Sequence, residues 1–196
     1  MRVGMIRNNV IGITGITGSG TSTVSAILAE RGGFVISADK LAREVTQKGQ
    51  PAYDEIVRTF GPSVVAAGGE IDRKALGALV FGSPQKLTVL ESIVHPAVIA
   101  RVEGMLEGRC SFTIIDAPLL IESGLHKICH SVWLVTARDD VRLARIMARD
   151  GIDIDTARQR LNSRAGDDIL RPHANVIIEN NADMDSLRVQ IERNLP

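Results

Sequence analysis

The fold is decided between Val10 and Ala29, where the chain reads VIGITGITGSGTSTVSAILA. The first five residues of this stretch are apolar or β-branched, as expected for a strand buried on both faces. A turn containing Gly15, Gly18 and Gly20 follows, and the remaining residues favour a helix. Such a turn directs successive backbone N–H groups, together with the positive end of the helix dipole, toward one point. The stretch therefore predicts a phosphate-binding site.

The glycine spacing is that of a P-loop, in which four residues separate two glycines and a lysine and a hydroxyl residue follow. Gly15 and Gly20 have this separation, and Ser22 occupies the hydroxyl position, where it is a predicted Mg²⁺ ligand. Thr21 occupies the lysine position. We predict that the phosphates of a nucleotide are bound by Gly15, Gly18, Ser19, Gly20, Thr21, Ser22 and Thr23.

The threonine removes a charge that P-loop enzymes place on the transferred phosphoryl group. A unit charge about 4 Å from a phosphate contributes roughly 4 kcal/mol at an effective dielectric constant near 20. Its loss corresponds to about three decades of rate. Nucleotide binding therefore follows more directly from the sequence than catalysis does. Lys40, Lys127 and the arginines between Arg138 and Arg171 are candidate replacement cations.

Four further apolar runs have the length and composition of buried strands: Phe34–Ser37, Phe112–Asp116, Val132–Val135 and Val176–Ile178. They alternate with helical patterns, as in βαβ units. The predicted fold class is α/β: a three-layer P-loop NTPase with a five-stranded parallel sheet flanked by helices.

Two connections are longer than a single crossover helix requires. About seventy residues, from Ala38 to Ser111, separate the second and third runs. We predict one domain over residues 1–196, with a nucleotide-binding core (10–38, 112–137 and 175–196), a helical insertion (39–111) and an arginine-rich segment (138–174).

Two aspartates stand at predicted strand ends, where doubly wound proteins bind ligands. Asp116 ends the third run and has the form of a Walker B carboxylate that orients Mg²⁺, whereas Asp39 follows the second run. Either is alternatively a helix N-cap, Asp39 above all, and both functions can coexist.

Eight of the eighteen arginines lie between Arg138 and Arg171, a segment without lysine. Arg138, Arg142, Arg145 and Arg149 share one helical face by their spacing. Arginine favours an anion-facing role, because a planar guanidinium binds phosphate in bidentate fashion. The seven acidic residues of the segment instead support a solvated charged face.

The 196 residues carry 23 basic and 23 acidic side chains and only 3% aromatic residues. This balance disfavours a nucleic-acid partner, and no apolar run is long enough to cross a membrane. We expect a cytoplasmic monomer or weak homo-oligomer in which Cys110 and Cys129 are reduced.

With these residues assembled, the chain resembles the dephospho-CoA kinase family from about Val10 to Asn181. The similarity is carried by the P-loop and by segments 38–45, 72–76, 95–96, 116–122 and 176–181. The resemblance implies a fold similar to that of nucleoside monophosphate kinases, in which 39–111 binds CoA and 138–174 forms a lid. It also implies transfer of the γ-phosphoryl of ATP to the 3′-hydroxyl of dephospho-CoA, with Mg²⁺.

The resemblance also implies roles for single residues. Asp39 would be the catalytic carboxylate that accepts or orients the 3′-hydroxyl, and Arg145 and Arg149 would be lid residues near ATP. Substrate-binding positions would be Arg73, His95 in a His95–Pro96 turn, Leu119 and Glu122. His95 is alternatively a residue that only caps its turn.

The sequence departs from the family pattern at Thr21, at Ser37 (usually aspartate), at Arg164 (usually glutamine) and at Leu170 (near a usual lysine). Three functions remain open: an active dephospho-CoA kinase, a kinase-fold protein that binds nucleotide or CoA without turnover, and a kinase for another small hydroxyl acceptor. Retention of Ser22, Asp39 and Asp116 favours phosphoryl transfer over binding without turnover.

Overall fold

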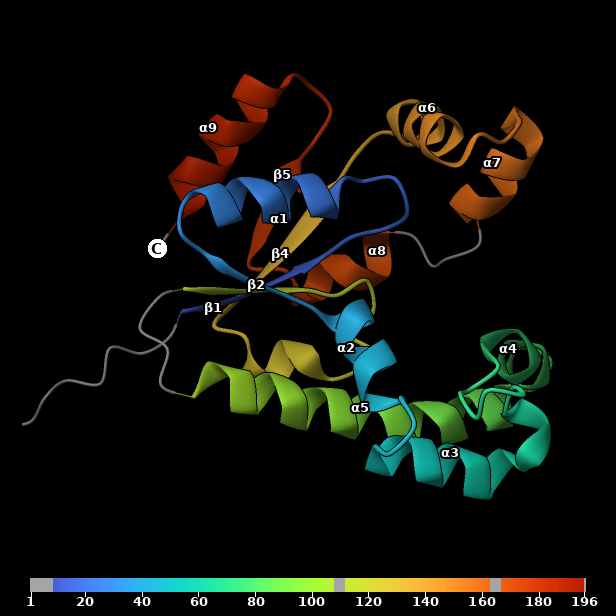
Figure 1. The fold of residues 1–196 in the computed structure, drawn as a ribbon. Coiled ribbons are helices and arrows are strands. Elements are labelled where there is room, and N and C mark those ends of the chain that lie inside the picture. The colour runs from blue at the N-terminus through green and yellow to red at the C-terminus, as the bar shows by residue number, and fades with distance from the viewer. Residues whose placement is uncertain (1–8, 108–111, 163–166, 196) are drawn as a thin grey trace, which may run out of the picture. The chain divides into compact units, whose positions relative to one another are not determined.

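The computed structural model describes residues 9–107, 112–162 and 167–195 (Figure 1). The chain forms two compact units. The core unit comprises Met1–Ile36 and Arg109–Pro196, and the helical unit comprises Ser37–Gly108. Among the helices described, none is long and apolar enough to cross a membrane.

The core unit is built on a five-stranded sheet in the order β2-β3-β1-β4-β5. Strand β1 pairs in parallel with β3 and β4, and β4 pairs in parallel with β5. This confirms the predicted parallel sheet. The strands are β1 (Val10–Thr14), β2 (Phe34–Ser37), β3 (Thr113–Asp116), β4 (Ser131–Thr136) and β5 (Val176–Glu179).

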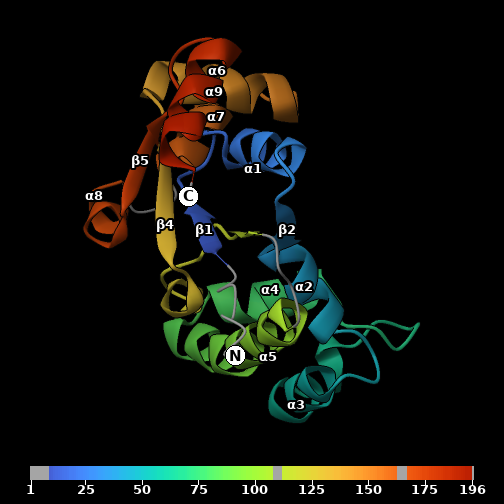
Figure 2. The same cartoon turned by 90° about the vertical axis from the view of Figure 1, so that its left-hand side faces the viewer.

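Helices α1 (Thr21–Glu30) and α9 (Met184–Asn194) lie on one face of the sheet (Figures 1 and 2). Their apolar residues join those of the strands in one buried cluster that includes Ile13, Trp133 and Leu187. Against the other face pack Leu120 and Cys129, next to Gly12. Gly12 is required there, because a Cβ atom would lie 2.7 Å from both the Cys129 Sγ and a Leu120 methyl carbon.

The remaining elements of the core unit are short or follow β4. They are η2 (Leu125–Ile128), α6 (Asp139–Asp150), α7 (Ile154–Asn162), α8 (Asp167–Leu170) and η3 (Arg171–His173). Helices α6 and α7 pack on each other. Arg164, at which the sequence departs from the family pattern, lies outside the described residues.

The helical unit contains α2 (Ala38–Val45), α3 (Pro51–Phe60), η1 (Pro62–Val64), α4 (Arg73–Phe81) and α5 (Pro84–Leu106). Helix α5 packs against α2, α3 and α4. Ile56, Val64, Leu76 and Val80 form the buried centre of the unit.

The predicted His95–Pro96 turn is wrong, because both residues lie inside α5. A residue before proline is usually pushed out of the α conformation, and proline cannot donate its helical hydrogen bond. Here the tertiary packing of a 23-residue helix against three others outweighs that local cost. His95 therefore caps no turn.

Candidate phosphate-binding site

The loop between β1 and α1 has a backbone that only glycine adopts readily. Gly18 and Gly20 have φ angles of 84° and 96°, in the left-handed region where a side chain is strained. Space is also absent at Gly20, where a Cβ atom would lie 2.2 Å from the Asn180 Nδ2. At Gly15 it would lie 2.5 Å from the Val135 carbonyl oxygen. The loop therefore packs tightly against β4 and against Asn180, the residue after β5.

Several amide groups of this loop face no protein acceptor. The Ser19 amide donates to the Ile16 carbonyl, and the Thr23 and Val24 amides donate to Gly20. Within the described residues, the amides of Gly18, Gly20 and Thr21 form no hydrogen bond to protein. These three unpaired amides, just before and at the N-terminus of the ten-residue helix α1, are suited to hold phosphate oxygens.

Arg142 of α6 fixes the outer side of the loop. Its Nε donates to the Thr17 carbonyl oxygen at 2.9 Å, and its Nη1 donates to the Asp139 carboxylate at 2.7 Å. A weaker contact joins its Nη2 to the Leu161 carbonyl oxygen at 3.5 Å. Arg142 is only 4% exposed. It does not belong to a solvated charged face.

Arg145 and Asn180 hold the next two loop residues. The Nη1 of Arg145 lies 3.4 Å from the Gly18 carbonyl oxygen and 3.2 Å from that of Ser19. The Asn180 side-chain amide donates to the same Ser19 oxygen at 2.9 Å. The Nη2 of Arg145 in turn donates to the backbone and side-chain oxygens of Asn180, both at 3.1 Å. Carbonyls held from outside leave the amides of the loop directed inward.

This clamp of Arg142, Arg145 and Asn180 was not foreseen from the sequence. The sequence places Arg142 on a shared, anion-facing helical face and Asn180 in the family segment 176–181, but it predicts a contact with the loop carbonyls for neither, although each carries a usable signal. Arg142 lies three residues after Asp139 and four before the buried Ile146, so it belongs to the buried stripe of α6. Asn180 directly follows a strand, at the carboxyl edge of the sheet.

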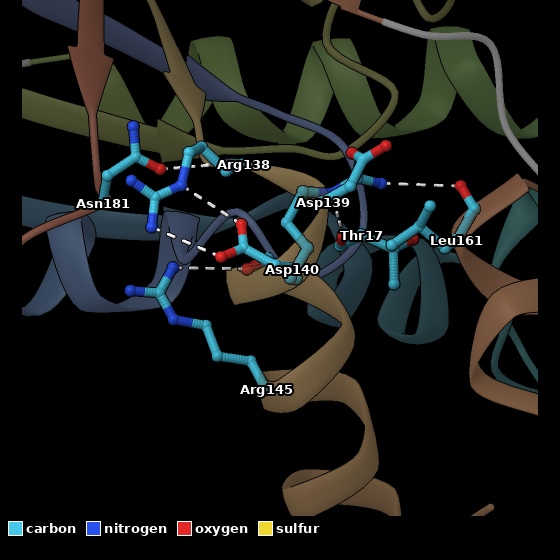
Figure 3. Close-up of polar contacts among 9 residues, drawn as sticks. Thr17, Arg138, Asp139, Asp140, Arg145, Leu161 and Asn181 are labelled. Carbon is cyan, nitrogen blue, oxygen red and sulfur yellow. Dashed lines mark hydrogen bonds and ion pairs between the residues drawn. The ribbon is translucent and has the colours of Figure 1, made fainter. Parts of the chain in front are cut away.

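Arg138 and Arg149 are engaged differently. Arg138 pairs with Asp140, and its backbone amide donates to the Asn181 side chain at 2.7 Å (Figure 3). Arg149 pairs with Asp150, which also contacts Arg160. Hydrogen bonding to Arg149 lowers the pKa of Asp150 to about 2. Contacts of Arg145 and Arg149 with ATP remain predictions.

The topology excludes one candidate for the missing lysine. Lys127 lies in η2, just before β4 begins, whereas the P-loop follows the end of β1. Because β1 and β4 are parallel, these two positions lie at opposite edges of the sheet. Lys40 belongs to the helical unit. Of the described arginines, Arg142 and Arg145 contact the loop, and both do so through its carbonyl oxygens.

Ser22 and Asp116 fit a magnesium site in donor chemistry. Ser22 lies exposed in the first turn of α1. Asp116 ends β3, which neighbours β1, so both residues lie at the same edge of the sheet. The alternative that Asp116 caps a helix is wrong, because turns follow it. Hydroxyl and carboxylate oxygens, completed by phosphates and water, suit Mg²⁺.

Asp39 lies in the first turn of α2, exposed and without a hydrogen bond or ion pair to the described residues. The alternative that Asp39 caps this helix is wrong. Ser37 is the N-cap, and its hydroxyl accepts from the Lys40 amide at 3.4 Å. The Asp39 carboxylate is therefore available to a ligand.

The predicted substrate-binding residues divide between the two units. Arg73 and His95 lie in the helical unit, where Arg73 is exposed at the start of α4. Leu119 and Glu122 lie in the core unit, exposed in the turns after Asp116. Their substrate contacts remain predictions.

Cys129 is a free thiol. Burial raises its pKa to about 12, which makes it a poor nucleophile near neutral pH. Cys110 lies outside the described residues.

A parallel sheet with this glycine loop between β1 and α1 defines a P-loop nucleotide-binding protein. The family model for dephospho-CoA kinase matches residues 9–186. A dephospho-CoA kinase of Carboxydothermus hydrogenoformans is 37% identical over 93% of this chain and 90% of its own length. The chain belongs to the dephospho-CoA kinase family.

Solved structures agree with the assignment. A crystal structure from Thermus thermophilus is 32% identical, with a TM-score of 0.80 over 95% of both chains. The dephospho-CoA kinase from Campylobacter jejuni is 27% identical, with a TM-score of 0.67 over 95% of this chain and 94% of its own. The predicted P-loop kinase fold is confirmed.

Proposed function

We propose that this chain phosphorylates the 3′-hydroxyl of dephospho-CoA with ATP, giving ADP and coenzyme A. The observation that carries the proposal is the set of unpaired P-loop amides of Gly18, Gly20 and Thr21 in a chain that belongs to this family over residues 9–186. Those amides and the α1 dipole would hold the ATP phosphates. The clamp of Arg142, Arg145 and Asn180 keeps the loop in the conformation that presents them.

Asp39 would accept the proton of the 3′-hydroxyl. As the ribose oxygen forms its bond to the γ-phosphorus, the bond from that phosphorus to the β–γ bridging oxygen breaks, and ADP leaves with the electron pair. The exposed and unpaired carboxylate of Asp39 suits this role. Ser22 and Asp116 would hold Mg²⁺, which supplies neutralisation of the phosphate charge when bound.

Mass spectrometry of the acceptor tests the proposal. With ATP, Mg²⁺ and dephospho-CoA, we expect conversion to coenzyme A, dependent on all three, and loss of at least about 100-fold in rate for Asp39→Asn. The matched control is Asp54→Asn, which removes an acid from the first turn of α3 in the same unit. No product above the enzyme-free reaction would contradict the proposal.

Thr21 favours a second candidate function, binding without turnover. A hydroxyl at the lysine position hydrogen-bonds a phosphate but carries no charge. In that case ATP and dephospho-CoA both bind, but no coenzyme A forms. Mass spectrometry of the acceptor, together with binding measurements for both ligands, therefore separates the two functions.

We also propose that the protein is cytoplasmic and is a monomer or a weak homo-oligomer. The free, partly buried thiol of Cys129 is in keeping with a reducing compartment. Sedimentation velocity on the full chain tests the oligomeric state.

A further inference from the structure

Two histidines that no step of the proposed reaction uses contact each other in the core unit. His126 lies in η2 and His173 lies in η3. Their ring centroids are 5.6 Å apart, and the ring planes are tilted by 56°. The two rings are therefore close enough to share one ligand, and they do not form a parallel stack.

The backbone holds this pair of imidazoles in place. Helix η2 ends three residues before β4, and η3 ends three residues before β5. These two strands pair in parallel, so both connections enter the sheet at the same edge. The Asn175 amide donates to the Val132 carbonyl oxygen at 2.9 Å, and the Val132 amide donates to the Asn175 side-chain oxygen at 2.7 Å. The contact of His126 with His173 therefore follows from the fold.

A hydrogen bond of His126 determines which of its ring nitrogens is free. Its Nδ1 lies 3.4 Å from the Leu120 carbonyl oxygen. Because a carbonyl oxygen only accepts, Nδ1 carries the proton of the neutral ring, and Nε2 keeps its lone pair. Metal-binding histidines show this arrangement, in which one nitrogen donates to a backbone carbonyl and the other binds the ion. His173 is exposed, and its ring has no hydrogen bond to the described residues.

The other histidine and the cysteine of this segment are engaged elsewhere. The Nδ1 of His130 accepts the Val10 amide at 3.1 Å, so its lone pair is used. The Cys129 thiol donates to the Leu125 carbonyl oxygen at 3.4 Å and packs next to Gly12. Over the described ranges, no three His, Cys, Asp or Glu side chains come together as a metal site. A site at the His126–His173 pair would therefore have two protein ligands, with water completing the coordination.

The separation of the rings suits one shared ion. Two imidazoles on a tetrahedral ion, each with a metal–nitrogen distance of about 2.1 Å, place their ring centroids about 5 Å apart. The observed 5.6 Å differs little from this value, and the exposed side chain of His173 is free to close the difference. Neutral imidazole favours Ni²⁺, Cu²⁺ and Zn²⁺ over Mg²⁺, which prefers oxygen ligands.

We propose that His126 and His173 together bind one divalent transition-metal ion of this class. The ion would join η2 to η3, two segments that are far apart in the sequence, and would thereby stabilise the folded chain. The site uses none of the residues to which the proposed function assigns a role, so the two proposals stand or fall separately.

Calorimetric titration of the untagged full chain with Ni²⁺ tests the proposal. The buffer contains millimolar Mg²⁺ and no nucleotide, so that sites with oxygen ligands do not contribute. We expect one Ni²⁺ per chain, bound at least about tenfold more weakly by His126→Gln and by His173→Gln. The matched control is His130→Gln, which removes an exposed histidine of the same segment and should leave the affinity within twofold of wild type. No binding at millimolar Ni²⁺, binding that neither variant of the pair weakens, or an equal loss in His130→Gln would overturn the proposal.

Urea denaturation tests whether the site belongs to the folded chain. Ni²⁺ at one hundred times its dissociation constant should raise the free energy of unfolding of the wild type by up to about 2.7 kcal/mol. It should leave His173→Gln unchanged, and this variant is not expected to misfold because the side chain is exposed. Equal stabilisation of wild type and His173→Gln would overturn the proposal. Neither measurement depends on kinase activity, so an inactive chain that binds Ni²⁺ at this pair would contradict only the proposed function.

Discussion

Replacing Arg142 with methionine removes one guanidinium from the outer side of the P-loop and retains most of the buried hydrocarbon. Three contacts of the guanidinium are lost, and they contribute different amounts to the free energy of unfolding. The partner Asp139 is 76% exposed on its side chain, so that ion pair contributes at most about 1 kcal/mol. The contact to Leu161 at 3.5 Å is at the limit of a hydrogen bond. The bond to Thr17 at 2.9 Å dominates, because a charged hydrogen bond is worth about 1.5–3 kcal/mol.

We therefore expect Arg142→Met to lower the free energy of unfolding by about 2–3 kcal/mol in urea denaturation. A loop that keeps its binding conformation only one tenth of the time binds ATP about tenfold more weakly, and calorimetry measures this change. The control Arg149→Met removes an arginine that is 61% exposed on its side chain and pairs with its neighbour Asp150, so its stability should stay within about 0.5 kcal/mol of wild type. Equal stability and equal ATP affinity in Arg142→Met and wild type would refute the clamp.

Three further perturbations have defined outcomes. Thr21→Lys should raise kcat/KM for ATP by about 10²-fold or more, whereas Thr21→Met should not; no gain from lysine would mean that another cation already serves. Gly20→Ala should weaken ATP binding at least tenfold, because its Cβ atom would lie 2.2 Å from the Asn180 Nδ2; unchanged affinity would contradict the loop geometry. In a Cys110→Ser background, Cys129 should react with a disulfide reagent at pH 8 at least about 100-fold more slowly in the native than in the unfolded chain, because burial raises its thiol pKa to about 12. Equal rates in the native and the unfolded chain would contradict the burial of this thiol. The pKa of Cys129 is higher in the folded state than in the unfolded state. Its contribution to the free energy of unfolding should therefore be intact below about pH 8.5 and decline as the pH rises toward 12.

The sheet and its P-loop could be predicted because each depends on short-range sequence. A strand covered on both faces is apolar along its whole length, and all five predicted strands agree with the structure to within two residues. The glycine spacing likewise fixes the loop, since the positive φ angles of Gly18 and Gly20 exclude other residues.

The errors arise where tertiary packing decides. His95–Pro96 has the local signature of a break, but the packing of α5 keeps both residues helical. The predicted arginine face includes Arg138, which is the N-cap of α6 and lies outside the helix, and spacing alone does not tell which arginine is buried. Arg142 is buried because Thr17, far away in the sequence, offers it a carbonyl oxygen.

The position of Lys127 shows a different limit. Its charge alone makes Lys127 a candidate replacement for the P-loop lysine. Strand order and direction place it at the opposite edge of the sheet, and neither is encoded in composition or spacing.

We propose that backbone amides near the start of α1 bind a triphosphate without the usual lysine. Titration of the full chain with MgATP in a calorimeter tests this binding most directly. We expect saturable binding at one site per chain, weakened at least tenfold by Gly20→Ala. Absence of binding to the wild-type chain at millimolar MgATP would contradict the claim.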